Sequence, residues 1–291
     1  MSHSKSLAAS KMASSKQSKL LDNIGLYAAF IVIALFTFFP VYWMLVTSLK
    51  FNEAVFKFPP DLIPWQATLE HYTNFINDPR LMKFTLNSIF VSVTTATFSV
   101  LISAYAAYSF SKFRYRGRRS LMYLVLSAQM FPQALLLITI YLMFNSLGLL
   151  HTYTGLVLSF ITFTLPLCIW MLKGYFDKIP SELIEAAKID GANHLKILHQ
   201  IILPISGPAL VSTFLFAFLR GWNDFIFALT LAGPDKQTLP PGLVLTYVGE
   251  FQTAWADMMA ASLLVSLPVV IAFIVFQRFI VGGLTAGAVK G

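Results

Sequence analysis

Two charged residues stand inside an otherwise apolar stretch, and they are the first candidates for chemistry in this chain. Arg220 and Asp224 are four residues apart in segment 205–231, so on one continuous helix they would share a face. Placing a single charge at the centre of a bilayer costs about 3 kcal/mol or more, so we expect the two to pair or to face a polar interior. Two interpretations stay open: a pathway lining or gate, or a structural ion pair near the external end of the helix.

Catalytic chemistry has little support elsewhere in the chain. No apolar segment carries a Ser/His/Asp or His/Glu constellation, and three histidines fall in or beside predicted loops: His151, His194 and His199. Cys168 is the single cysteine and is predicted to be core packing, which leaves no metal cluster. A phosphate-binding G-x-x-x-x-G-K-[ST] loop is missing, because Ala288 follows the correctly spaced Gly282 and Gly287. We therefore predict that this chain is not an enzyme and holds no metal or cofactor of its own.

The composition is that of a membrane protein. Of 291 residues, 57% are hydrophobic and 12% charged, against about 25% charged in a soluble domain, and the mean hydropathy is +0.70. A spanning helix needs about 20 apolar residues, and the backbone in lipid must satisfy its own hydrogen bonds, which favours helices over strands. Six segments qualify, five of them without an acidic or basic residue: 24–49, 84–110, 120–144, 154–172, 205–231 and 258–277. The predicted fold is all-α with six transmembrane helices.

The basic residues predict the orientation of these helices. The loop 112–119 holds five basic residues and no acidic one, and the N-terminal tail 1–23 holds four lysines: Lys5, Lys11, Lys16 and Lys19. Such segments stay in the cytoplasm, and an even number of helices puts the C-terminus there too. The net charge of +8 is thereby explained without a nucleic-acid partner. The tail itself is predicted to be disordered.

A polar block, residues 173–204, separates the fourth and fifth apolar segments, and the predicted topology places it in the cytoplasm. Ser181 is a candidate helix cap, with Glu182 and Glu185 at the positive end of the helix dipole. Gly191 can supply the left-handed turn that ends the helix, and a second helix would stop before Pro204. From composition alone, this block is either an ordinary amphipathic interfacial helix or a docking site for a partner.

The order of residues in the block resembles the EAA loop, E-A-A-x-x-D-G-A followed by a late I-x-L-P, of ABC-importer permease subunits. Leu198 departs from that pattern, which often has Phe at this place, but the position stays apolar. The matching residues are Glu185, Ala186, Ala187, Asp190, Gly191, Ala192, Ile201, Leu203 and Pro204. The resemblance extends over nearly the whole chain, with a first transmembrane helix at 24–49, a type I importer core at 82–277 and a tail at 278–291.

The resemblance implies a division of labour among several subunits. In such permeases the EAA helix seats in a cleft on an ATP-binding subunit, so ATP and Mg²⁺ belong to two partner ATPases. Closure of these ATPases moves two homologous permeases between inward-facing and outward-facing states. Carried over to this chain, Glu185 makes polar contacts in that cleft, Ala186 and Ala187 allow close approach, and Gly191 makes the turn.

The C-terminal tail narrows the resemblance to carbohydrate-type permeases, similar to the smaller permease of maltose/maltodextrin importers. The tail would then contact the ATPases through Thr285, Gly287 and Lys290. An external loop, 232–257, is expected to form a turn at Pro240, Pro241 and Gly242 and to reach into the cleft of an external solute-binding protein. A rigid connector remains the simpler interpretation of that loop.

The expected function is therefore that of a multi-pass permease subunit in a bacterial inner membrane. It would translocate a sugar, an oligosaccharide such as maltose or maltodextrin, with ATP hydrolysed by partner subunits. The alternative is an ion-coupled secondary transporter of a small polar solute. That class places ionisable residues at the midplane of the membrane, and Arg220 and Asp224 are the only charged residues within the predicted spans.

Overall fold

The computed structural model describes residues 2–249 and 253–285, with side chains over 23, 25–249 and 253–277. These residues form helices and turns, with one isolated β-bridge between Val248 and Thr253, so the all-α prediction is confirmed. The chain divides into two compact units, residues 1–71 with 255–260 and residues 72–254 with 261–291.

The first unit is dominated by one long helix. Its elements are α1 (Ser2–Ser48), the 3-10 turn η1 (Asn52–Ala54) and the first turns of α13 (Trp255–Thr285). The part of α1 over Gly25–Ser48 is apolar and long enough to cross a membrane. Over residues 1–23, where the sequence predicts a disordered tail, α1 is helical from Ser2. Once a helix is nucleated, each added residue costs little, and this tail contains good helix formers such as alanine, lysine and leucine.

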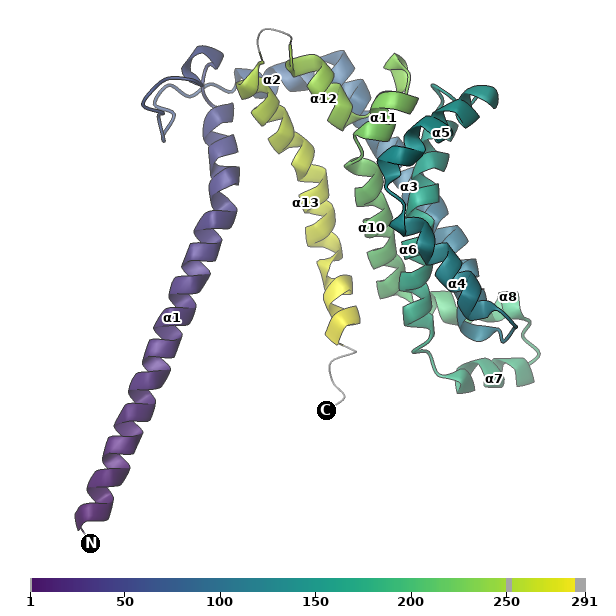
Figure 1. The fold of residues 1–291 in the computed structure, drawn as a ribbon, viewed down its shortest axis with the longest axis horizontal. Coiled ribbons are helices and arrows are strands. Elements are labelled where there is room, and N and C mark those ends of the chain that lie inside the picture. Colours follow the sequence, from purple (N-terminus) through teal and green to yellow (C-terminus); the bar gives the residue numbers. More distant parts are fainter. Residues whose placement is uncertain (1, 250–252, 286–291) are drawn as a thin grey trace. The chain divides into compact units, whose positions relative to one another are not determined.

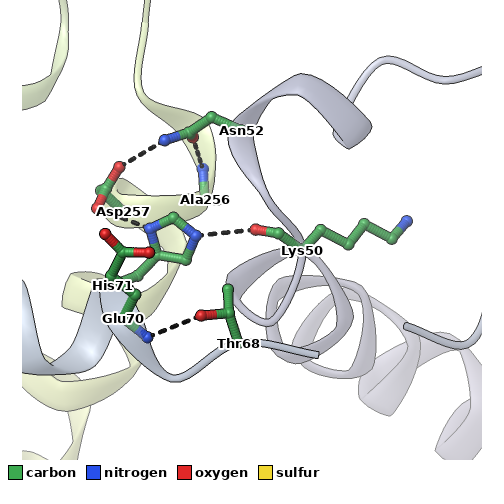
Figure 2. Close-up of polar contacts among 7 residues, drawn as sticks. All are labelled: Lys50, Asn52, Thr68, Glu70, His71, Ala256 and Asp257. Atoms are coloured by element: carbon green, nitrogen blue, oxygen red, sulfur yellow. Dashed lines mark hydrogen bonds and ion pairs between the residues drawn. The ribbon is translucent and has the colours of Figure 1, made fainter. Parts of the chain in front are cut away.

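A buried polar cluster joins the segment after α1 to the first turn of α13 (Figure 2). The His71 side chain is 5% exposed; its Nδ1 lies 2.7 Å from Asp257 Oδ1, and its Nε2 lies 2.8 Å from the Lys50 carbonyl oxygen. Asn52 donates from Nδ2 to Asp257 Oδ2 at 2.8 Å and accepts the Ala256 backbone N–H at 3.2 Å. Three of these four hydrogen bonds join segments that are far apart in sequence, 50–71 and 256–257, and the fourth, from His71 to Lys50, closes the first segment on itself.

The second unit is a bundle built on three packed helices, α3, α6 and α10 (Figure 1). Figure 1 shows α7 and α8 at one end of this bundle and α5, α11 and α12 toward the other. Besides the remainder of α13, its elements are α2 (Glu70–Asn77), α3 (Pro79–Lys112), α4 (Arg118–Ser127), η2 (Ala128–Met130), α5 (Gln133–Ser146), α6 (Tyr153–Phe176), α7 (Ser181–Ile189), α8 (His194–Ile197), η3 (Leu198–Ile202), α9 (Leu203–Ile205), α10 (Gly207–Trp222), α11 (Ile226–Leu231), η4 (Pro234–Lys236) and α12 (Leu239–Tyr247).

Small and hydroxyl-bearing residues on α3 let the three helices approach closely. A Cβ placed on Gly221 of α10 would lie 3.2 Å from the Ser92 Cα, so the two backbones nearly touch there. Ser99 and Thr164 share a buried hydrogen bond of 2.7 Å between α3 and α6. Close packing of this kind is what holds helices together in lipid, where burying apolar surface brings little gain.

The start of α3 shows why this long helix begins where it does. Pro79 occupies the first turn, where its missing N–H costs nothing, and the Asp78 carboxylate accepts the Arg80 backbone N–H at 2.8 Å. The hydrogen bond from the Arg80 side chain lowers the pKa of the Asp78 carboxyl. The cap therefore stays ionised at neutral pH.

Two of the six predicted spans are not single helices. Within the described residues, four helices are long and apolar enough to cross a membrane, and the number reaches six only if two bent pairs each count as one span. Segment 120–144 bends by 96° between the helical stretches 118–130 and 133–146, and the fifth span bends by 82° where segment 194–205 meets α10. Helix α10 also ends at Trp222, before α11 begins. Hydropathy records length and composition, and it does not register such breaks.

Candidate functional site

The polar block folds as the sequence predicts, into a helix closed by a left-handed glycine. Gly191 has φ +78°, and its N–H donates to the Lys188 carbonyl at 3.0 Å. The next N–H, from Ala192, donates to the Ala187 carbonyl at 2.9 Å, which completes a Schellman motif at the end of α7. A residue with a Cβ would be strained at this φ, although the space around it is open. One detail of the prediction is wrong: Ser181 is the first helical residue, and no side chain caps the helix.

Helix α7 presents one face to the bundle and leaves the other exposed. Ile184 and Ala187 are buried, 6% and 8% exposed, in a cluster with Phe176 and Ile197. Ala187 therefore packs within the chain, and the expectation that it allows close approach of an ATPase subunit stays a prediction. The outward face carries residues at helical spacing of three and four: Glu182, Glu185, Ala186 and Ile189.

Ile189 is the member of this face that the sequence reasoning missed. Its side chain is 86% exposed, although it is a large apolar group at the end of a polar helix. An isoleucine beside exposed carboxylates and a small alanine is a mixed surface of the kind that binds another protein. The i, i+4 relation between Glu185 and Ile189 could have revealed this from sequence.

Hydrogen bonds fasten the whole block to the end of α3. Tyr108 Oη lies 3.2 Å from His194 Nδ1, and Tyr105 Oη lies 2.8 Å from His199 Nε2. Lys112 donates from Nζ to the Ile179 carbonyl at 2.8 Å, just before α7 begins. These hydrogen bonds attach the residues on both sides of α7 to the end of α3.

The second helix of the block is interrupted by a π-helical turn, η3 (Leu198–Ile202). Asn193 starts α8 by accepting the Lys196 N–H on its side-chain oxygen at 2.8 Å. Pro204, which lacks an N–H, follows within α9 and lies exposed. Because π-helical turns are rare and gather at functional sites, this one supports the interpretation of the block as more than a connector.

The charged pair of the fifth span is arranged differently from the expectation. Asp224 lies beyond the end of α10, so it shares no helical face with Arg220. Arg220 donates from Nη2 to Gln133 Oε1 at 2.9 Å, and Asp224 accepts the Ala228 N–H at 3.0 Å at the start of α11. No ion pair joins the two among the described residues, but both line one cavity of about 430 Å³, together with Gln133.

The expected turn at 240–242 is the first turn of a helix. Pro240 and Pro241 open α12, where prolines are tolerated, and Pro241 and Gly242 are buried. A Cβ on Gly242 would lie 2.4 Å from Phe84 Cδ2, so this glycine is required by packing against α3. The C-terminal candidates add nothing here: Thr285 is the last residue of α13, and Gly287 and Lys290 lie outside the described residues.

Comparison with known proteins identifies the class. Residues 99–285 match the family model described as binding-protein-dependent transport system inner membrane component. The chain is 38% identical to the inner membrane ABC transporter permease protein YcjP of Escherichia coli, over 96% of this chain and all of that one. It is also 38% identical to the trehalose/maltose transport system permease protein MalG of Thermococcus litoralis, over 94% of this chain and 99% of that one.

A solved structure agrees with the sequence relatives. The fold matches a chain of a bacterial ABC transporter that imports the acidic polysaccharide alginate, with a TM-score of 0.80, 25% identity, and coverage of 90% of this chain and 98% of that one. The chain therefore belongs to the family of binding-protein-dependent transport system inner membrane components. It is a permease subunit, a translocation component of an ABC importer, and not an enzyme.

Proposed function

We propose that this chain translocates a sugar through a bacterial inner membrane, powered by ATP that partner subunits hydrolyse. The importer would comprise a homologous second permease, two ATP-binding subunits that hold ATP and Mg²⁺, and an external solute-binding protein. Relatives named for trehalose/maltose and for galactooligosaccharides support a saccharide cargo. A finer assignment to maltose or maltodextrin follows the resemblance of the tail and the first of these relatives.

The observation that carries this proposal is the outward face of α7. This face is exposed and carries Glu185, Ala186 and Ile189, on a helix that ends in the Schellman turn. The tyrosines of α3 hold the stretch that follows this helix, through His194 and His199. A rigid mixed surface at one end of a helix bundle is suited to seat in a cleft on an ATPase subunit. In this proposal, Asp190, Gly191 and Pro204 shape the block, Ala187 fixes it to the bundle, and Glu185 makes a polar contact.

Replacing the exposed apolar side chain of this face with a charged one tests whether the face docks on an ATPase subunit. Ile189→Asp should abolish co-purification of the ATPase subunits, because a buried carboxylate without a partner is costly at an interface. The matched control is Leu245→Asp on α12, which changes an exposed leucine toward the opposite end of the bundle (Figure 1). Normal assembly with Ile189→Asp, or equal loss with both variants, would rule out α7 as the docking surface.

The alternative of ion-driven transport makes a different prediction. Proteoliposomes that contain the assembled importer should accumulate sugar only with ATP inside and with the solute-binding protein outside. Uptake driven by a proton or sodium gradient without ATP would favour a secondary transporter. Calorimetry on the solute-binding protein then identifies the sugar.

The orientation in the membrane is proposed from the basic loops, and labelling of introduced cysteines tests it. With Cys168 replaced by alanine, cysteines at Arg116 and Lys188 should resist an impermeant thiol reagent added outside intact cells, while cysteines at Asp61 and Asp235 should react. Asp235 is chosen because it is exposed, whereas the nearby Gln237 is buried. Labelling at Arg116 from outside would overturn the placement of both termini in the cytoplasm.

Two further contacts are proposed from the resemblance. The external segment 232–257 would meet the solute-binding protein, with Pro240, Pro241 and Gly242 acting as its rigid base rather than as the contacting tip. The tail, with Thr285, Gly287 and Lys290, would contact the ATPases. Truncation after Thr285 should lower transport while leaving the permease in the membrane. Full transport by the truncated chain would show that the tail is not needed as a contact with the ATPases.

A further inference from the structure

The cavity at the α10–α11 break combines polar and aromatic groups in a way that the gate interpretation does not use. Its volume is about 430 Å³, within the range of about 300–1,000 Å³ that is usual for small-molecule sites. The start of α5 and the end of α10 form its walls, and residues 223–225 cross it without helical structure. Non-helical backbone at membrane depth is tolerated where it is buried in protein or lines a water-filled cavity.

Donors and acceptors in this cavity are held in fixed places. A guanidinium has five N–H donors, and one of those on Arg220 goes to Gln133 at 2.9 Å. The Asp224 carboxylate, with about four acceptor sites, is held at the start of α11 by the Ala228 N–H at 3.0 Å. Asn223 adds an amide to the lining. Adjacent donors and acceptors of this kind suit neighbouring hydroxyl groups, each of which both donates and accepts.

Charge and aromatic surface decide which solute fits. The single positive charge of Arg220 is balanced by the negative charge of Asp224 in the same lining, so the cavity carries no net charge. An anionic sugar would lack an uncompensated cation and would be repelled by the carboxylate. Phe216, Phe225 and Phe227 also line the cavity and offer apolar ring surface.

We propose that this cavity holds one ring of an uncharged saccharide, so that this subunit itself contacts the sugar during translocation. Arg220 and Asp224 bond the hydroxyl groups, and the phenylalanine rings cover the apolar face of the sugar. This inference rests on the proposed transport of a saccharide, but it also names the place and the charge class. The structural alternative is that the polar groups only stabilise the break, in which case no sugar enters.

Protection of an engineered cysteine tests the inference directly. Ala134 lines the cavity, and Leu229 on α11 is exposed but is not part of the lining. The complete importer, with its solute-binding protein, carries either Ala134→Cys or Leu229→Cys in a Cys168→Ala background. The rate of labelling by a small thiol reagent is measured with maltose, with trehalose, and with a mannuronate disaccharide as the acidic probe.

We expect maltose or trehalose to slow labelling at position 134 at least about 3-fold, without an effect at position 229, and the acidic probe to give no protection. Asp224→Asn should weaken protection by the neutral sugars and let the mannuronate disaccharide protect. Failure of both neutral sugars to protect, equal protection at position 229, or stronger protection by the acidic probe would each overturn the inference. ATPase stimulation by the loaded binding protein, measured on the same samples, reports separately on the proposed importer function.

Discussion

Removing His71 should loosen the segment between α1 and α2 by a predictable amount. The substitution His71→Ala deletes one hydrogen bond to the Asp257 carboxylate, at 2.7 Å, and one to the Lys50 carbonyl, at 2.8 Å. A bond to a charged group contributes about 1.5–3 kcal/mol and a neutral bond about 1 kcal/mol, so we expect a loss of about 3 kcal/mol. At about 1.4 kcal/mol per factor of ten, the local opening equilibrium should rise roughly 150-fold.

Hydrogen–deuterium exchange of the assembled importer measures this opening. Peptides that cover residues 50–71 and 255–260 should exchange faster in His71→Ala, while peptides from α6 should be unchanged, because local opening need not involve the rest of the fold. The control Gln66→Ala changes an exposed polar residue in the same segment and should alter stability by less than about 0.5 kcal/mol.

A double-mutant cycle separates the contact from a general loss of packing. Asp257→Ala alone should also be strongly destabilising, since it strips His71 and Asn52 of their shared partner. The double substitution His71→Ala with Asp257→Ala should cost less than the sum of the two, because no buried carboxylate is then left with an incomplete set of partners. Additive effects, or an increase below 3-fold in the exchange of residues 50–71 in His71→Ala, would refute the reasoning.

Three further predictions concern the bundle. At Gly191 the constraint is the φ of +78° and not crowding, so Gly191→Val should nearly abolish sugar uptake while the permease reaches the membrane at normal levels. Gly191→Asn should retain most of the uptake, because asparagine tolerates this φ. Equal loss of uptake in both variants would point to contact with the ATPase instead. Gly242→Ala should lower the free energy of unfolding by about 1–3 kcal/mol, because the added methyl group contacts Phe84, and Phe84→Leu should restore part of this loss. An unchanged stability in Gly242→Ala would contradict the packing argument. Tyr105→Phe should raise the amount of ATP consumed per sugar imported, because it removes the hydrogen bond between α3 and His199 of the polar block 173–204. The control Tyr153→Phe removes a hydrogen bond to Asn87 near the other end of the bundle and should leave this ratio unchanged. An unchanged ratio in Tyr105→Phe would show that this hydrogen bond does not couple the block to α3.

Much of the fold follows from local patterns in the sequence. The apolar segments predict where helices can cross a membrane, and an all-α protein results because lipid offers the backbone no other hydrogen-bond partner. The Gly191 turn is equally local: a glycine after a short helix is the residue that adopts the left-handed conformation most easily, and the structure has it there. Such features depend on neighbours in the chain, so the sequence alone determines them.

Other features were decided by tertiary packing. Ala187 is buried and Ile189 is exposed because of how α7 lies on its bundle, which the helical pattern alone did not determine. Arg220 bonds Gln133 from another helix, at the start of α5 directly after the bend at residues 131–132, and hydropathy does not register that bend. The breaks fall at Phe131-Pro132, at Ser206 and at residues 223–225, and such short signals are too weak to read against a strong apolar background.

His71 and Asp257 give the clearest contrast between the two kinds of information. They are 186 positions apart, and neither residue has a neighbour in sequence that predicts its partner. Hydropathy and helix caps depend on interactions between residues that are close in sequence, so a single segment of the chain determines them. A buried polar pair instead depends on where two distant segments meet, because burial removes water and leaves only the groups that the fold brings within hydrogen-bonding distance. The sequence thus determined where most apolar segments are helical and that Gly191 makes the turn after α7, and the tertiary structure determined where those helices break and which polar groups are partners.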